Sequence, residues 1–562
     1  MKRMPFDLGK AFSDDLSRGG ADDAPAKPGI PFLLPCALLL WAAAAAAYAG
    51  LEGAGARQAM QVALALGGAC ALAVAVAAAA RRRGAVLAAF LVAGSALGAS
   101  ASCAYHAAAE DVPDGRQRVE LELASDERAT AFGAYCSARF TTEDGRSGKA
   151  TVFFDEPTGL LAGCRLACEA SFSPVSDDYR SRSYYSGETA QLDAGDSSLL
   201  PLAAPLQAVC DVRRSAIDLI ARHGGDQTGV LQALVCGYRG TIQEDGVYEA
   251  FKACGLAHVV AVSGAHLAIV TMVFGWALRR LRAPRVATLA ASVAFVGAYL
   301  VFAGVPVSAV RAAVMVVMSL VAGVAGRRNA TANSLAVCMV AFLVSDPSSC
   351  VSVSLFLSAA STLGIVLFAS LVSSWLGALP SALRASVAEP VGLTLSSHLL
   401  TMPFSAAAFG MVPVLSVPAN VVATPLFTVG CVCGLVCTLA GCAFPAVAAP
   451  AIGLASLAAF PLQAFVSWAS LLPFACVEVE LPAAAMLALS AAGACALWLA
   501  WPRVRTAAFG GALAAGLFAY VLLAFCMPAP AGDAIVMLDV GQGDALLVRS
   551  EGRTLLVDTG NE

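Results

Sequence analysis

The chain has 562 residues, of which 59% are hydrophobic and 13% are charged, and its formal net charge is −4. A soluble domain carries about 25% charged residues, so half that share over so long a chain leaves too little polar surface for a soluble globule. The composition therefore excludes a purely soluble protein and predicts an α-helical protein that crosses a bilayer many times.

The N-terminal part contains one polar segment followed by three apolar runs. Residues 1–30 are polar and mixed in charge, which does not fit a cleavable signal. A helix needs about 20 apolar residues to cross the hydrocarbon core. We therefore expect three transmembrane helices within 31–106, near 31–50, 58–80 and 84–106.

Residues 107–208 are polar and predict a small β domain. Val119–Leu123 alternates apolar and polar residues as a half-buried strand does, Ala150–Phe154 is a second strand candidate, and Glu143–Gly145 is a turn signal. A region of this size suits an OB-like barrel of about 100 residues. Either a disulfide or free thiols fits its cysteines, Cys136, Cys164 and Cys168.

An amphipathic connector at 209–257 leads into a second apolar block at 258–527. We expect about ten helices there, of which the one at 331–345 is short. The predicted spans are 258–279, 286–303, 307–326, 331–345, 351–376, 386–410, 413–440, 446–472, 482–501 and 507–527.

The positive-inside rule predicts how these spans are oriented. With the N-terminus in the cytoplasm, the cytoplasmic loops hold the basic residues, such as Arg81–Arg83 and Arg279–Arg285. The short loops that the same count places outside the cytoplasm, such as 304–306 and 346–350, hold no Lys or Arg. The count therefore predicts a multi-pass protein of the cell membrane, with the β domain and the C-terminus outside the cytoplasm.

The C-terminal segment 528–562 changes to a strand pattern. Strands are expected at Ala534–Val540, Ala545–Arg549 and Thr554–Asp558, separated by glycine-containing turns. This pattern predicts the start of an α/β domain whose remaining part lies beyond the chain.

The stretch Leu256–Leu267 places polar residues at the start of the second apolar block. His258, Ser263 and His266 stand where a lipid-facing helix would have apolar residues, and Ser263-Gly264 would allow a close helix approach. These residues predict either a polar path through the membrane or a packing motif. A metal site is a weak interpretation, because no carboxylate is nearby in the sequence.

Arg311 lies just inside a span that begins on the outer side, so the positive-inside rule does not explain it. It either reaches the interface or lines a path for an anion. No Asp or Glu occurs between Phe251 and Ser345, which favours a polyanion over a cation as the transported species.

A pattern of basic and aromatic residues in the β domain is typical of contact with single-stranded nucleic acid. Because the pattern is short, a solvated loop with ordinary tyrosine packing is the alternative. Its residues are Tyr179, Arg180, Arg182, Tyr184 and Tyr185.

Several motifs resemble the ComEC family of competence proteins. The run Gly255–Leu267 resembles the family signature, and Pro306–Ala312 and Pro418–Leu426 resemble two further membrane stretches, the latter containing Asn420. Leu538–Ala545, with Asp539, Gln542 and Asp544, and Val557–Gly560, with Asp558, look like the start of the family's metallo-β-lactamase-like domain.

The resemblance implies a channel for single-stranded DNA in natural transformation, with an OB domain and a C-terminal metallo-β-lactamase-like domain outside. It implies a DNA receptor and a cytoplasmic motor or DNA-binding protein as partners, besides membrane lipid. Its channel path would include His258, Ser263, Gly264, His266, Arg311 and Asn420.

The chain departs from the family pattern in its C-terminal part. The family's nuclease role uses manganese or zinc held by an HxHxDH cluster, and no HxH occurs in this sequence. We therefore assign no catalytic residue and no cofactor to this chain, and expect a metal only with a full C-terminal domain. Two alternatives stay open, a membrane-tethered nuclease whose catalytic part is missing and a transporter of lipid or glycan.

Overall fold

The computed structural model describes most of the chain, in segments separated by short gaps and one long gap. The described residues are 30–80, 83–113, 115–130, 133–175, 179–282, 284–324, 331–376, 388–472, 475–478, 534–538, 545–550 and 553–557. The chain divides into two compact units, Met1–Leu499 and Ala500–Glu562, and each is described by itself.

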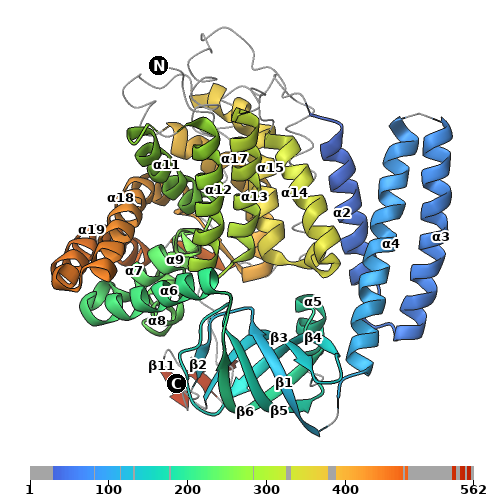
Figure 1. Ribbon diagram of the computed structural model, residues 1–562, viewed down its shortest axis with the longest axis horizontal. Helices are drawn as coiled ribbons and strands as arrows, with labels where there is room; N and C mark the ends of the chain where they lie inside the picture. Colours follow the sequence, from blue (N-terminus) through green and yellow to red (C-terminus); the bar gives the residue numbers. More distant parts are fainter. Residues whose placement is uncertain are drawn as a thin grey trace. The chain divides into compact units, whose positions relative to one another are not determined.

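Apolar helices dominate the first unit (Figure 1). Five helices in the described residues are long and apolar enough to cross a membrane, namely α3 (Ala56–Ala80), α4 (Arg83–Glu110), α15 (Val353–Leu376), α18 (Ser416–Ala443) and α19 (Ala448–Ser470). Four shorter ones are also apolar, namely α2 (Leu33–Ala49), α12 (Arg285–Phe302), α13 (Val307–Val324) and α14 (Thr331–Ser345). The predicted spans 482–501 and 507–527 lie outside the described residues.

Two further helices belong to the described part of the membrane block, and shorter elements connect its helices. These are α11 (Gly264–Arg280) and α17 (Glu389–Phe409). The predicted connector contains α6 (Ala204–His223), η2 (Gly225–Gln227), α7 (Thr228–Cys236), α8 (Gly240–Glu244) and α9 (Val247–Ala253), and α10 (Ala257–Val260) follows. The remaining short elements are η3 (Pro347–Val351), η5 (Pro445–Val447), and the paired strands β7 (Met411–Pro413) and β8 (Cys476–Glu478).

The polar region folds as a closed β barrel. Its strands are β1 (Gly115–Leu123), β2 (Arg128–Thr130), β3 (Gly133–Thr142), β4 (Ser147–Phe154), β5 (Arg165–Ser173) and β6 (Ala190–Leu200), with α5 (Arg180–Ser186) before β6. The barrel closes because β1 pairs antiparallel with both β3 and β5, and β4 pairs parallel with β6.

Alternating side chains fill the barrel interior. Val119, Leu121 and Leu123 point inward and are buried, while Glu120 and Glu122 are exposed, which confirms the strand predicted at Val119–Leu123. The three cysteines of this region are free and buried. Burial raises the pKa of Cys136 to about 12 and that of Cys168 to about 11, so both are protonated at neutral pH.

Buried side chains join the barrel to the helices, and Figure 1 shows the barrel at one end of them with α6 to α9 next to it. Tyr184 of α5 stacks on Tyr48 of α2 with 4.4 Å between the ring centroids, and it hydrogen-bonds Ser102 of α4. On the other side, Arg213 of α6 forms two hydrogen bonds with Asp126 of the barrel, of 2.7 and 2.8 Å. The barrel is therefore fastened to the N-terminal helices and to the connector.

The described part of the second unit is a three-stranded antiparallel sheet. Its strands are β9 (Ala534–Leu538), β10 (Ala545–Ser550) and β11 (Arg553–Val557), with β10 in the centre. The strands predicted in this segment are thereby confirmed, apart from Asp539, Val540 and Asp558, which lie outside the described residues.

Candidate functional site

The second apolar block begins with a break in the chain rather than with one continuous span. Ala261 and Ser263 have extended backbone conformations, and α11 begins only at Gly264. The Nδ1 atom of His266 accepts a hydrogen bond of 3.1 Å from the Ser263 N–H, as a Glu or Gln at this position does in a capping box. The predicted span 258–279 is corrected accordingly, because His258 and His266 belong to different helices.

His266 combines full burial with an unused hydrogen-bond donor. Because its Nδ1 accepts from Ser263, the neutral ring carries its proton on Nε2. That Nε2 atom is buried and has no hydrogen-bond partner among the described residues, and the ring lies edge-on to Phe427 of α18 at 4.7 Å. A buried donor without an acceptor is costly, so this position suits an oxygen atom of a ligand.

Two other helices bring further polar side chains to the same place. His258 hydrogen-bonds the side chain of Asn420 on α18, and the Asn420 Nδ2 donates to the Ser416 carbonyl at 2.7 Å. The hydroxyl of Ser416 in turn lies 3.3 Å from Nδ1 of His398 on α17. His258 is exposed, whereas Asn420 and Ser416 are buried.

We call this set of residues the polar cluster: His258, Ser263, His266, His398, Ser416 and Asn420. It gathers three of the five histidines of the chain from α10, α11 and α17. His258 lies within electrostatic range of both His266 and His398. Within the described part of the chain, no carboxylate acts on these three rings and no group of His, Cys, Asp or Glu is arranged to hold a metal. The cluster is therefore a set of polar donors and acceptors without a carboxylate among the described residues.

Two members of the polar cluster, His398 and Ser416, were not singled out from the sequence. A signal for His398 exists, because a histidine within an apolar helix is expensive and so marks a functional position. Its meeting with His258 could not be predicted, because these residues are far apart in the sequence and only the packing of α10, α17 and α18 brings them together.

Gly264 begins α11 beside α13. A Cβ atom added to Gly264 would lie 3.6 Å from the Cβ atom of Ala312, which is an ordinary contact. An alanine would therefore fit at position 264, and the expected close approach of a neighbouring helix does not explain the glycine. The N-terminal end of α13 is tied to this region instead by the hydroxyl of Ser308, which donates to the Val262 carbonyl at 2.8 Å.

Arg311 of α13 is 9% exposed and faces α15. Its Nε donates to the Ser358 hydroxyl at 2.6 Å and its Nη1 to the Thr362 hydroxyl at 2.8 Å. These partners are neutral, and no ion pair of Arg311 occurs among the described residues. A guanidinium with uncompensated charge inside an apolar bundle attracts an anion. The Arg311 side chain is thus buried between α13 and α15, and its role in an anion path stays a prediction.

The basic and aromatic segment of the β domain forms α5, and its side chains differ in exposure. Tyr179, Arg180 and Arg182 are exposed, and Tyr185 is partly exposed with its hydroxyl 2.9 Å from the Glu52 carboxylate. Tyr184 is 1% exposed because both ring faces and its hydroxyl are used in packing against α2 and α4. The predicted DNA contact is therefore corrected for Tyr184, which has no free ring face for a base.

The residues predicted for the C-terminal motif lie outside the described residues. They are Asp539, Gln542, Asp544 and Asp558.

The apolar helices around this polar interior define a multi-pass helical membrane protein. The model of the family "Competence protein" matches residues 234–504, which include the polar cluster and Arg311. The chain is 30% identical over 349 residues to "Competence protein ComA" of Neisseria gonorrhoeae, a match that covers 60% of this chain and 47% of that protein. It is 26% identical over 355 residues to "ComE operon protein 3" of Bacillus subtilis (strain 168), covering 60% of this chain and 42% of that protein.

These similarities support the resemblance of the chain to the ComEC family of competence proteins. The matches span less than half the length of these two relatives. No solved structure matches the chain.

Proposed function

We propose that the chain forms a channel that carries single-stranded DNA through the cell membrane during natural transformation. The observation that carries this proposal is the polar cluster, where the unused Nε2–H donor of His266 lies in a helical region that matches competence proteins. Uncharged donors can bind and release phosphate oxygens in succession, which conduction of a charged polymer requires.

Arg311 supports a polyanion as the transported species. It supplies a positive charge that only hydroxyl groups and a sulfur contact among the described residues. A buried cation without a carboxylate favours an anion in its neighbourhood and disfavours a cation. This charge fits the DNA channel, and among the alternatives it disfavours a transporter of lipid or glycan whose substrate carries no negative charge.

We assign the barrel an OB-like fold outside the cytoplasm. The closure of β1 on both β3 and β5, with the parallel pairing of β4 and β6, supports this assignment. Tyr179, Arg180, Arg182 and Tyr185 are exposed and stay candidates for contact with DNA. A DNA receptor outside and a cytoplasmic motor or DNA-binding protein inside are the proposed partners.

The β9–β11 sheet supports the start of a metallo-β-lactamase-like domain in the C-terminal segment. The described residues contain no group of His, Cys, Asp or Glu that could hold the manganese or zinc of such a domain. Nuclease activity would require ligands that the described part of this chain does not supply.

The channel is tested by His266→Gln. Glutamine is a natural capping-box residue at this position, so the substitution preserves the start of α11 while it replaces the fixed ring Nε2–H by an amide N–H donor at a different position. Loss of one hydrogen bond to a charged group costs about 1.5–3 kcal/mol, so we expect transformation to fall roughly tenfold or more at an unchanged membrane level. Ser263→Ala and Arg311→Gln should also lower it.

The matched control is His223→Gln, which changes an exposed histidine at the end of α6. It should transform like the unsubstituted chain. If His266→Gln, Ser263→Ala and Arg311→Gln all reach the membrane and transform normally, the polar cluster does not line a DNA path and the channel proposal is wrong.

A further inference from the structure

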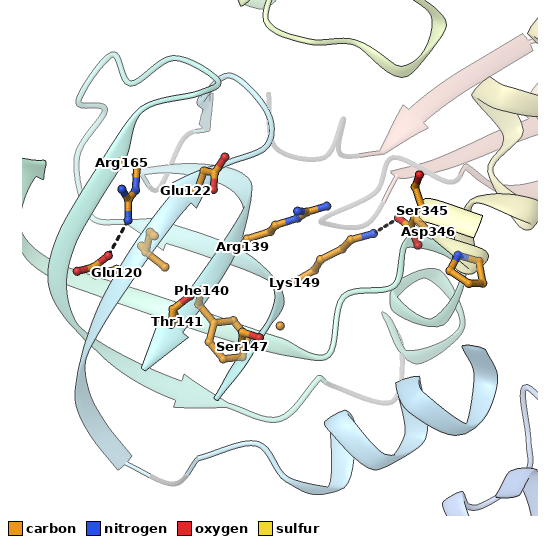
Figure 2. Close-up of a pocket in the computed structure, with 13 residues that line it drawn as sticks. Glu120, Glu122, Arg139, Phe140, Thr141, Ser147, Lys149, Arg165, Ser345 and Asp346 are labelled. Carbon is orange, nitrogen blue, oxygen red and sulfur yellow. Dashed lines mark hydrogen bonds and ion pairs between the residues drawn. The ribbon is translucent and has the colours of Figure 1, made fainter. Parts of the chain in front are cut away.

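A cleft of about 400 Å³ separates the outer face of the barrel from the end of α14 (Figure 2). Strands β1, β3 and β4 and Arg165 line the barrel side, and Ser345–Pro347 line the helical side. Its volume is in the range of sites that bind small ligands or parts of larger ones.

Two cations lie side by side on the barrel face of this cleft. Arg139 of β3 and Lys149 of β4 are directly opposite each other in the antiparallel register. Like charges in that arrangement destabilise a sheet unless an anion lies between them. Figure 2 shows both side chains extending toward Ser345 and Asp346.

Only one of these two cations has an anionic partner in the described structure. The Nζ of Lys149 lies 2.6 Å from Oδ2 of Asp346, and both side chains are about one-third exposed. Arg139 is exposed and has no ion pair or hydrogen bond with any described residue. One cation of the pair therefore has no ion-pair partner among the described residues.

The acidic side chains of this barrel face form no ion pair with Arg139 among the described residues. Glu120 pairs with Arg165 at 2.8 Å. Glu122 lies directly opposite Arg139 in the register of β1 and β3, but no ion pair joins the two side chains. Glu188 accepts hydrogen bonds from Ser137 and Thr151, which lie farther along β3 and β4. Arg139 and Lys149 are therefore the two cations of the cleft that extend toward Asp346.

Asp346 is held in its ionised form. Desolvation opposes ionisation, but hydrogen bonds from Lys149 and Ser348 outweigh it and keep the pKa below the ordinary value of 3.8. Because this pKa is lowered on folding, the ion pair contributes fully at neutral pH and is lost only as the pH falls through the lowered value. Its exposure makes the pair weak and replaceable, since solvent and salt screen it.

We infer that Arg139 and Lys149 form a binding site for a phosphodiester of single-stranded DNA. In the absence of DNA, Asp346 forms an ion pair with Lys149, and the phosphodiester displaces Asp346 from Lys149 when DNA binds. This inference rests on the proposed function for the identity of the anion. A phosphodiester offers two acceptor oxygens, which suit the fork of Arg139 and the point charge of Lys149. Asp346 remains anchored after the exchange, because it also caps η3 through the Ser348 N–H at 3.2 Å.

The test measures binding of a fluorescent oligothymidylate to the purified full chain in detergent, by anisotropy over a range of salt concentrations. Each lost phosphate contact lowers the slope of log K against log salt by about 0.7 for single strands, which is roughly fivefold in affinity at 0.1 M salt. We expect this loss for Arg139→Gln and for Lys149→Gln.

Asp346→Asn separates a binding site from a structural ion pair. Asparagine still caps η3, while the competing charge disappears, so DNA affinity should rise several-fold. Arg116→Gln is the matched control, because it removes an exposed barrel cation that pairs with Glu169 and does not line the cleft, and it should bind like the unsubstituted chain.

Normal affinity in Arg139→Gln and Lys149→Gln, or weaker binding in Asp346→Asn, would overturn the inference. The binding assay does not depend on transport. If the cleft variants bind DNA normally while His266→Gln lowers transformation, the cleft inference is wrong and the channel proposal stands. If the polar-cluster variants transform normally while the cleft variants bind DNA differently, the cleft site is kept and the channel proposal is wrong.

Discussion

The buried Arg213 side chain connects three parts of the chain. It is 1% exposed, pairs with Asp126 of the barrel, and donates through Nε to the Cys236 carbonyl at the end of α7 at 3.2 Å. Burial alone would lower the pKa of Arg213, but Asp126 outweighs burial and raises it, so the pair is ionised. Such a pair is more important for geometry than for net stability.

Asp126→Ala should strongly destabilise this junction. The substitution leaves a buried guanidinium unpaired, which costs about 3–5 kcal/mol. We expect a clearly lower melting temperature of the purified protein in detergent. Glu120→Ala, which breaks the exposed pair with Arg165, should change stability by less than about 1 kcal/mol.

The double variant Asp126→Asn with Arg213→Met distinguishes an unpaired charge from a general loss of packing. Asparagine retains the acceptor for the Ala162 N–H, and methionine removes the buried charge. Its melting temperature should lie nearer to that of the unsubstituted chain than to that of Asp126→Ala. A melting temperature for Asp126→Ala equal to that of Glu120→Ala would contradict the assigned role.

At the scale of elements, α2 and α4 approach each other at two glycines. A Cβ atom at Gly94 would overlap the Leu40 carbonyl, and one at Gly98 would overlap the Ala44 carbonyl. The two glycines are four residues apart, as are the two carbonyls, so they form a small-residue seam along one face of α4. Helices in lipid associate through such close packing, because lipid is as apolar as their side chains.

Gly94→Ala and Gly98→Ala should each weaken the contact between α2 and α4. Overpacking costs about 1–3 kcal/mol, so the melting temperature in detergent should fall. Gly67→Ala and Gly68→Ala in α3 are matched controls, because a Cβ at either position meets nothing within 4 Å. If all four variants melt alike, the seam does not hold these helices together.

Local patterns predicted some elements well and others poorly. Alternation identified the strand at Val119–Leu123, and apolar length identified 331–345, which matches α14. The break before Gly264 was missed because a histidine takes the capping position that Glu or Gln usually takes. Four members of the polar cluster were named from the sequence, but their meeting with His398 and Ser416 was not predictable, and neither was the cleft, because both arise where distant segments pack and no local period records that.

At the scale of the whole first unit, a chain of contacts places the barrel at one end of the membrane helices. Arg213 pairs with Asp126 of the barrel and lies against Gly304, in the turn between α12 and α13. Ser308, at the start of α13, bonds the Val262 carbonyl just before α11. The start of α11 therefore lies at the barrel end, and its basic last turn, with Arg279 and Arg280, lies about 25 Å away.

This separation predicts that the barrel and the end of α11 face opposite sides of the membrane. Basic loops favour the cytoplasm, so a reporter fused after Arg282 should read as cytoplasmic. A reporter inserted at Gly145, in the exposed turn between β3 and β4, should read as external. If both reporters read as the same side, the barrel and the end of α11 do not lie at opposite ends of the membrane helices. If the reporter after Arg282 reads as external and the one at Gly145 as cytoplasmic, that arrangement stands but the predicted orientation is wrong. An external barrel would place the Arg139–Lys149 site where DNA arrives, before the polar cluster.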